Sequence, residues 1–465
     1  MSAIDYAAVD GLALVEAVRG RRARAREICD VALARIATHG PAVNAFTCVL
    51  AEQARADADR VDATIAAGGD PGPLAGMPFA VKNLFDVAGL TTLAGSKINA
   101  SRPPAVRDAF VVSAIRRAGG VLVGALNMDE YAYGFTTENT HYGPAHNPHD
   151  PTRVAGGSSG GSGAAVGAGL VPLALASDTN GSIRVPAALC GVFGFKPTYG
   201  RLSRTGSALF APSFDHVGPL GRSVRDVTAA YDVMQGPDPH DPACAGRPVE
   251  ACLPRLGEGI GGLRIAVLDD HFARGGEPGA FAAVAQMAAA LGVSRRATIP
   301  EAQRARAAAM VITASEGAAL HLADLKTRAE DFDPLTRDRF LAGALVPAGW
   351  YVQAQRFRAW YREQVTALFR EIDVLLAPTT PCPAPRIGQD RMVLDGVEVL
   401  TRPNLGVYTQ PLSFIGLPIL SVPVTRPGAL PLGVQVIAAP FREAHALRVG
   451  AVLEAKAVAT AAIAT

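Results

Sequence analysis

Two serine-rich segments near the middle of the chain carry the residue types that nucleophilic chemistry needs. They are Gly156-Gly-Ser-Ser-Gly-Gly-Ser162 and Ser177-Asp-Thr-Asn-Gly-Ser-Ile-Arg184. A serine hydroxyl becomes a good nucleophile when a base removes its proton. Successive backbone N–H groups in a glycine-containing turn can face one point and bind an oxyanion. A serine before an apolar helix is also a common N-cap, so the second segment alone allows either interpretation.

A third candidate stands out because lysine is rare. Only five of the 44 basic residues are Lys, which leaves 39 Arg (44 − 5). Lys82 ends the apolar run Gly76-Met-Pro-Phe-Ala-Val-Lys82. Arg stays protonated in proteins, whereas a buried Lys can lose its proton. Lys82 is therefore a position where Arg would not serve.

The glycine-rich segment fits three well-known motifs less well. A dinucleotide fingerprint fails because Val166 stands where its third Gly or Ala belongs. A phosphate-binding P-loop fails because no Lys follows the glycines. The pattern G-x-S-x-G does occur with Ser159 at its centre, but the acid and histidine that it requires, for example Asp373 and His445, have no telling context. We expect no metal, because Pro148 breaks any helix that would align His146 and His149.

Short apolar runs alternate with helical patterns along the chain, which favours an α/β fold with a mixed central sheet. The sheet and the helices that cover both of its faces are predicted to form a single domain over residues 1–465. Residues of about 225–370 are rich in long helical patterns and predict a smaller lobe. The expected strands are 76–83, 121–126, 171–176, 263–268, 373–377 and 433–438, and the expected helices are 7–17, 25–36, 105–119, 162–169, 279–291, 301–326, 350–371 and 443–456.

The composition narrows the class of protein. The 465 residues are 49% hydrophobic and 18% charged, with a net charge of +2, so we expect a folded chain without a basic field for nucleic acid. The six cysteines form no C-x-x-C pair, and free thiols predict a cytoplasmic location. The uncharged stretch 154–177 contains too many Gly and Ser residues for a lipid-facing helix, so no membrane association is expected.

The motifs together resemble the amidase signature family. The stretch from Gly156 to Pro197, which ends Cys190-Gly-Val-Phe-Gly-Phe-Lys-Pro197, follows the family's signature almost throughout. Further blocks such as Asn127-Met-Asp-Glu130 and Pro431-Leu-Gly-Val-Gln435 extend the resemblance to nearly the whole chain. The blocks Leu93-Ala-Gly-Ser-Lys-Ile-Asn99 and Val311-Ile-Thr-Ala-Ser-Glu-Gly317 are similar to members that hydrolyse 1-carboxybiuret in cyanuric acid breakdown.

The resemblance implies a Ser–cis-Ser–Lys triad and no cofactor. Ser182 would be the nucleophile, Ser158 the bridging serine after a cis peptide bond, and Lys82 the base. Ser158 precedes Ser182 by 24 residues (182 − 158), which is the family's spacing. The implied oxyanion hole consists of the backbone N–H groups of Thr179, Asn180, Gly181 and Ser182.

Asn180 departs from the family, which usually has Gly at this position. Because Asn tolerates left-handed dihedral angles, it could simply preserve the turn, or its amide could contact the substrate. Ser159, Asp178 and Arg184 are expected to support the loop through hydrogen bonds. An anionic substrate needs a cation in its pocket. The candidates are Lys326, Arg328, Arg337 and Arg339, and Arg328 is our choice.

The resemblance implies an amidohydrolase that releases ammonia from a small amide or ureide such as 1-carboxybiuret through an acyl-enzyme. It also implies a homodimer, with a possible small helical partner subunit. The main alternative is the A subunit of a glutamyl-tRNA(Gln) or aspartyl-tRNA(Asn) amidotransferase, which uses the same triad as a glutaminase. A third class, a non-catalytic protein on the same scaffold, is disfavoured by the intact Lys82, Ser158 and Ser182.

Overall fold

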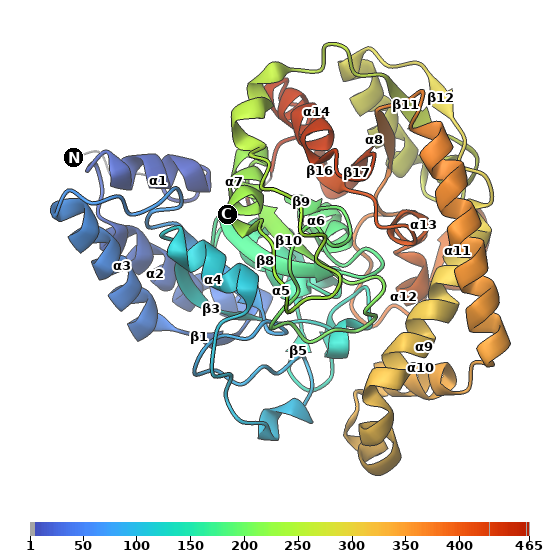
Figure 1. Ribbon diagram of the computed structural model, residues 1–465, viewed down its shortest axis with the longest axis horizontal. Helices are drawn as coiled ribbons and strands as arrows, with labels where there is room; N and C mark the ends of the chain where they lie inside the picture. The colour runs from blue at the N-terminus through green and yellow to red at the C-terminus, as the bar shows by residue number, and fades with distance from the viewer. Residues whose placement is uncertain (1–4, 427, 462, 465) are drawn as a thin grey trace.

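A computed structural model describes residues 5–426, 428–461 and 463–464 of the chain (Figure 1). Its centre is a mixed eleven-stranded sheet with the strand order β1-β3-β2-β8-β10-β9-β16-β17-β13-β11-β12. The strands of this sheet are β1 (Phe46–Val49), β2 (Pro78–Lys82), β3 (Val121–Leu126), β8 (Leu173–Asp178), β9 (Phe193–Lys196), β10 (His216–Gly221), β11 (Ile265–Leu268), β12 (Arg296–Ala297), β13 (Val374–Pro378), β16 (Ile419–Arg426) and β17 (Ala429–Ala438).

Helices flank this sheet, which confirms the predicted fold class. One group, α5 and α6, packs against β8, β9, β16 and β17, and a second, α7 and α14, packs against β10, β16 and β17. The helices are α1 (Gly11–Arg19), α2 (Ala25–Val43), α3 (Ala51–Ala66), α4 (Phe110–Arg117), α5 (Gly160–Gly167), α6 (Arg184–Cys190), α7 (Val224–Met234), α8 (Pro278–Leu291), α9 (Ala302–Arg328), α10 (Pro334–Ala344), α11 (Ala348–Leu368), α12 (Thr401–Asn404), α13 (Gln410–Ser413) and α14 (Glu443–Ala455). Three small hairpins are formed by β4 (Glu138–Asn139) with β5 (Gly143–Pro144), β6 (His146–Asn147) with β7 (Asp150–Val154), and β14 (Arg391–Leu394) with β15 (Val397–Leu400).

Two kinds of strand pairing bring the site together. β2 runs parallel to both β3 and β8, so the ends of β2 and β8 lie at the same edge of the sheet. β8 and β10 are antiparallel, with Asp178 opposite His216. Lys82 at the end of β2 therefore lies close to the serine-rich loop that leaves β8.

The segment 225–370 is divided between the main sheet and a helical layer. β11 pairs with β13, and β12 pairs with β11, so both strands extend the central sheet. In contrast, α9 packs along α10 and α11 at the edge of the molecule, where the three helices lie together (Figure 1). The three helices α9, α10 and α11 of this layer cover residues 302–368.

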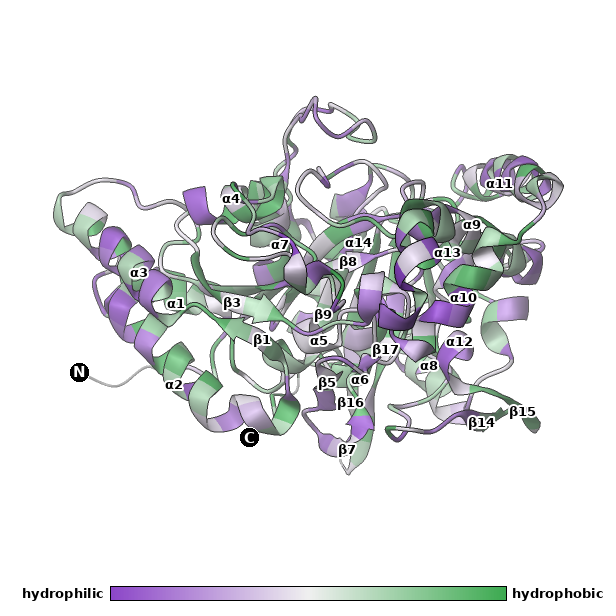
Figure 2. Cartoon of the chain, turned by 90° about the horizontal axis from the view of Figure 1, so that it is seen from below, coloured by the Kyte–Doolittle hydropathy of each residue, from purple (hydrophilic) through white to green (hydrophobic). Residues whose placement is uncertain are grey.

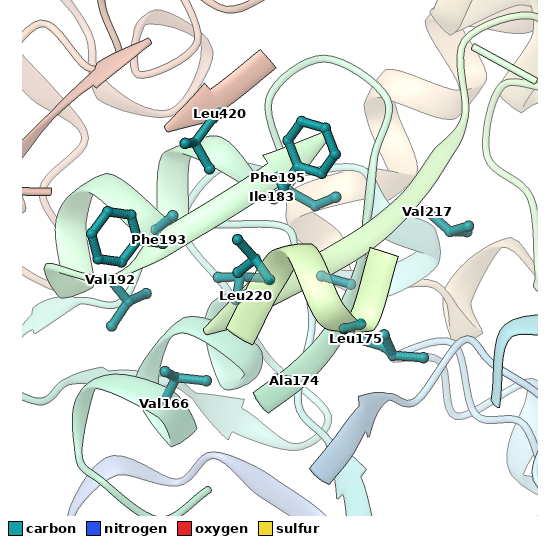
Figure 3. Packing of buried hydrophobic residues seen from close by; sticks show 14 of the residues in the cluster. Val166, Ala174, Leu175, Ile183, Val192, Phe193, Phe195, Val217, Leu220 and Leu420 are labelled. Atoms are coloured by element: carbon teal, nitrogen blue, oxygen red, sulfur yellow. The ribbon is translucent and has the colours of Figure 1, made fainter. Parts of the chain in front are cut away.

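The core beneath the site is apolar and closely packed. The labelled residues of Figure 3 lie on or directly beside α5, α6, β8, β9, β10 and β16, and Phe193, Phe195 and Leu220 are fully buried. Peripheral helices such as α3 carry both hydrophilic and hydrophobic residues, whereas β3 is hydrophobic along its length (Figure 2). None of the described helices is long and apolar enough to cross a membrane.

Candidate active site

Lys82 and Ser158 meet inside the protein, as the resemblance implies. Lys82 is the last residue of β2, and Ser158 lies in the loop that leads into α5. The Lys82 Nζ donates a hydrogen bond of 2.7 Å to the Ser158 Oγ and one of 3.0 Å to the Ser177 Oγ. The peptide bond between Gly157 and Ser158 is cis. Lys82 and Ser158 are completely buried, so bulk water does not compete for their hydrogen bond.

Burial also changes the protonation of Lys82. Removal from water lowers the pKa of Lys82 from 10.5 to about 7, and the nearby carboxylates of Asp129, Asp215 and Asp178 oppose this shift. A lysine with such a pKa is neutral in a large fraction of molecules at neutral pH. Lys82 can therefore accept a proton, which an exposed lysine could not do.

Ser182 lies in the loop between β8 and α6. It lines a large cavity, and its hydroxyl makes no hydrogen bond to any described residue. The Ser158 and Ser182 hydroxyls are thus not hydrogen-bonded to each other in this structure. Ser182 is only 2% exposed, so its free hydroxyl faces the cavity and not open solvent.

The loop before Ser182 leaves its backbone donors free. Residues 180–182 belong to no helix or strand. Their backbone N–H groups donate to no backbone carbonyl of the described residues. Gly181 has φ = +143°, and a Cβ at this position would lie 2.3 Å from the Oγ1 of Thr409. Because only glycine fits this conformation and space, residue 181 is fixed by the shape of the loop.

The positive φ angle of the loop bears on one of the two roles that the sequence allows for Asn180. The left-handed conformation is not at Asn180, which has no positive φ, and Gly181 takes that role. The expectation that Asn180 preserves a left-handed turn is therefore wrong. The alternative, in which the amide faces the substrate, fits its position on the cavity wall.

A buried ion pair anchors the loop at both ends. The Arg184 Nε and Nη2 donate to the two carboxylate oxygens of Asp178 at 2.9 and 3.0 Å. The Arg184 Nη1 also donates to Gln435 Oε1 at 2.7 Å. Burial would raise the pKa of Asp178, but the charge and hydrogen bonds of Arg184, together with Lys196 and His216, lower the pKa to about 2. Asp178 thus remains charged beside Arg184, and the pair supports the loop, as the sequence suggests.

Two further side chains hold the loop from outside. Thr179 donates through its hydroxyl to Asp215, whose second oxygen accepts the N–H groups of Phe210 and Ala211. Burial raises the pKa of Asp215 to about 6, against these hydrogen bonds. Ser159 donates to the carbonyl of Ser177 at 3.2 Å, which links the two serine-rich segments.

The cavity has a volume of about 780 Å³. Several arginine side chains line it, but Arg328 is not one of them. Arg328 is at the far end of α9, where its Nε pairs with Asp331 at 2.9 Å. The prediction for Arg328 is therefore wrong in position. Arg339, on the next helix α10, lines the cavity together with Ser182.

Arg339 is suited to bind an anion because its charge is not neutralised. The Arg339 Nη1 donates to the Tyr133 carbonyl at 2.8 Å, and its guanidinium lies 3.7 Å from the centre of the Tyr133 ring. No carboxylate of the described residues lies within ion-pair distance of it. Arg402, in contrast, lies 3.4 Å from Asp129 and 3.6 Å from Glu138.

The sequence does not single out two residues of the site, Ser177 and Arg339, although Arg339 is among the candidate cations. Ser177 begins one of the serine-rich segments, yet its bond to Lys82 depends on the parallel pairing of β2 and β8. Arg339 is one of many arginines in a helical segment, and no spacing distinguishes it. Its approach to Tyr133 follows only from the packing of α10.

The mixed sheet and the buried Lys82–Ser158 pair, with the free Ser182 hydroxyl in the loop after β8, indicate a hydrolase of the amidase type. The Amidase family model matches residues 27–447, so this chain belongs to the amidase family, whose members hydrolyse C–N bonds. The chain is 55% identical to AtzE, the 1-carboxybiuret hydrolase subunit of Pseudomonas sp. (strain ADP), over 96% of this chain and 98% of that one. It is 39% identical to the A subunit of glutamyl-tRNA(Gln) amidotransferase from Chromohalobacter salexigens, over 94% of each chain.

Solved structures give the same relationships. The inhibitor-bound complex of an s-triazine catabolic enzyme superposes with a TM-score of 0.96 at 53% identity, covering 97% of this chain and all of the other. The A subunit of glutamyl-tRNA(Gln) amidotransferase from Thermotoga maritima gives a TM-score of 0.83 at 30% identity, covering 98% of this chain and 96% of the other. The amidotransferase subunits are thus more distant relatives.

Proposed function

We propose that this amidohydrolase cleaves a small anionic ureide of the 1-carboxybiuret kind and releases ammonia. The observation that carries the proposal is Arg339, which has no carboxylate partner among the described residues and lines the same cavity as Ser182. A guanidinium can bind a carboxylate through two parallel hydrogen bonds, which fixes the orientation of a small substrate. The 55% identity to a 1-carboxybiuret hydrolase subunit supports the same substrate class.

The proposed reaction starts with a proton relay. Neutral Lys82 takes the proton of the Ser158 hydroxyl, with which it shares a 2.7 Å hydrogen bond. Ser158 takes the proton of Ser182 in the same step, and the Ser182 Oγ attacks the carbonyl carbon. A hydroxyl both donates and accepts, so Ser158 returns to its initial state after each transfer.

The negative charge then develops on the substrate carbonyl oxygen. The backbone N–H groups of Thr179, Asn180, Gly181 and Ser182 are proposed to bind this oxyanion. The relay returns the proton to the departing nitrogen, so the C–N bond breaks and ammonia leaves. Water then attacks the acyl-enzyme and gives up its proton along the same path, which releases the acid and restores Ser182.

The role of Arg339 can be tested with a matched pair of substrates. Malonamate carries a carboxylate, whereas malonamide is its neutral amide. We expect Arg339→Gln to raise KM for malonamate about 10- to 100-fold, since a charge-assisted hydrogen bond contributes about 1.5–3 kcal/mol. KM for malonamide should remain nearly unchanged. Arg328→Gln serves as the control and should change neither value, because Arg328 lies outside the cavity.

Ammonia release from carboxybiuret, biuret, malonamate and indoleacetamide tests the substrate class. Hydrolysis of the ureides by this chain without RNA would support the proposal. Glutaminase activity that requires tRNA and a second protein chain would favour the amidotransferase alternative. The 39% identity to an amidotransferase A subunit is the reason to test this alternative. Equal loss of malonamate and malonamide turnover in Arg339→Gln would contradict the assignment of Arg339.

We also propose that the chain forms a homodimer in the cytoplasm, with a possible small helical partner subunit. The relative with a TM-score of 0.96 is described as part of a protein complex, which supports an assembly. All six cysteines are free thiols, which fits a reducing compartment. Light scattering of the purified chain, alone and after co-expression with a neighbouring small reading frame, would test the assembly.

A further inference from the structure

Asn180 lies at the wall of the cavity and has a buried side-chain acceptor without a hydrogen-bond partner among the described residues. The residue is 9% exposed, and its Oδ1 is buried without a hydrogen-bond partner among the described residues. Asn180 lines the same cavity as Ser182, two residues away. A buried carbonyl without a donor is costly in a folded protein, so such a group calls for a partner. The simplest such partner is a ligand that supplies the missing N–H.

The orientation of the Asn180 amide is set by its neighbours. The Asn180 Nδ2 lies 3.4 Å from the Oγ1 of Thr313, a buried residue of α9. The Thr313 hydroxyl donates its own proton to the Ala309 carbonyl at 2.9 Å, so its remaining lone pairs can only accept. The NH₂ end of the amide must therefore face Thr313, which leaves the carbonyl end free. Thr409 further fixes residue 180 by donating to its main-chain oxygen at 2.6 Å.

We propose that the Asn180 side-chain carbonyl accepts a hydrogen bond from an N–H of the substrate next to the scissile carbonyl. This inference rests on the proposed ureide substrate. A ureide carries N–H where an ordinary dicarbonyl amide carries CH₂. A substrate with N–H at this place can donate a hydrogen bond to the buried acceptor and is stabilised. A substrate with CH₂ cannot donate, so the acceptor stays without a partner and the substrate binds less well. Asn180 would thus select ureides, while Arg339 recognises the carboxylate at the other end.

Biuret and malonamide provide a direct test, because they differ by NH in place of CH₂ between the two carbonyl groups. The quantity to measure is the ratio of kcat/KM for biuret to kcat/KM for malonamide. Comparing this ratio between proteins cancels the difference in intrinsic reactivity. In Asn180→Gly the ratio should fall about tenfold or more. In Asn180→Asp, which retains an acceptor oxygen, the ratio should stay near the wild-type value even if both rates fall.

Thr313 is expected to act as a positioning residue for this amide. Thr313→Val removes the acceptor that orients the Nδ2 and should lower the biuret-to-malonamide ratio, whereas Thr313→Ser should restore it. Thr327 offers a matched control, since it lies on the same helix and makes the same type of bond, from its Oγ1 to Ala323 O at 3.0 Å. Thr327→Val should leave the ratio unchanged.

The outcomes separate this inference from the proposed function. If Asn180→Gly lowers both rates equally and keeps the ratio, Asn180 only shapes the oxyanion loop and the inference is wrong. If the wild-type protein cleaves simple amides but no ureide, the proposed substrate class fails and the inference fails with it. If the wild-type protein cleaves ureides and the ratio responds only to Asn180 and Thr313 variants, both stand.

Discussion

The dependence of activity on pH tests the role of Lys82 most directly. Lys82 can accept a proton only when it is neutral, so kcat/KM should rise with pH and level off above the pKa of Lys82 in the free enzyme. With a pKa of about 7, the midpoint of this rise should lie near neutral pH. Below the midpoint, log(kcat/KM) should increase by about one for each pH unit.

The magnitude follows from the cost of burial. At pH 7, a lysine with a pKa of about 7 is about half neutral, whereas one with the ordinary pKa of 10.5 would be neutral in only about one molecule in 3,000. The shift corresponds to about 5 kcal/mol between the two protonation states.

The pKa of Lys82 also affects folding stability. It is lower in the folded chain than in the unfolded chain, so between about pH 7 and 10.5 the unfolded chain binds the additional proton. Through this window Lys82 makes the free energy of unfolding rise with pH.

A charge variant moves the midpoint in a direction that can be stated in advance. Asp129 is the first of the carboxylates that raise the pKa of Lys82. Asp129→Asn should therefore shift the rise of kcat/KM to lower pH. Asp70→Asn is the control, because it removes the same charge from a side chain that is 75% exposed. Asp215 has a raised pKa of about 6, so Asp215→Asn shows whether this carboxyl, and not Lys82, produces the rise.

Rates should be measured from about pH 5.5 to 9, on either side of the expected midpoint, with the best substrate of the panel. Circular dichroism should confirm folding at each pH. A midpoint about three pH units higher, where an exposed lysine titrates, or a flat profile would refute a neutral Lys82 as the base. So would a rise that disappears in Asp215→Asn while Lys82 is intact. Movement to higher pH in Asp129→Asn would show that the electrostatic reasoning has the wrong sign.

Three other predictions concern the loop around Ser182, the proposed nucleophile. Ser182→Ala should lower kcat by about 10⁴-fold or more with unchanged urea denaturation, because the hydroxyl makes no bond in the fold; residual activity near wild type would exclude Ser182 as the nucleophile. Gly181→Ala should displace the oxyanion loop against Thr409 and lower kcat more than it raises KM, which steady-state kinetics would reveal. Arg184→Met should destabilise the protein by about 3–5 kcal/mol at neutral pH, since Asp178 would keep a buried charge without a partner; a urea midpoint equal to that of the wild type would contradict this.

The helices α9 and α10 show which properties the sequence predicts and which it cannot predict. The helical pattern over 301–326 matches α9, whose bounds are Ala302–Arg328, because an apolar period is a local property. The choice of the substrate cation is not local. Arg328 and Arg339 are equivalent in sequence terms, yet Arg328 forms a half-buried pair with Asp331 and Arg339 reaches Tyr133, 206 residues away. Only the packing of α10 against the Tyr133 loop distinguishes them.

The candidate base is predictable for a related reason, since its chemistry restricts residue type. A base that must be neutral near pH 7 excludes Arg, so a Lys at the end of an apolar run, such as Lys82, is informative despite the absence of any local contact. Its tuning is not predictable, because burial lowers the pKa while three carboxylates from separate segments raise it. One of these, Asp178, is itself held ionised by Arg184. The same buried ion pair thus holds the loop that carries Ser182 and limits how far the pKa of Lys82 can fall, so a variant at Arg184 should disturb both the proposed base and the loop.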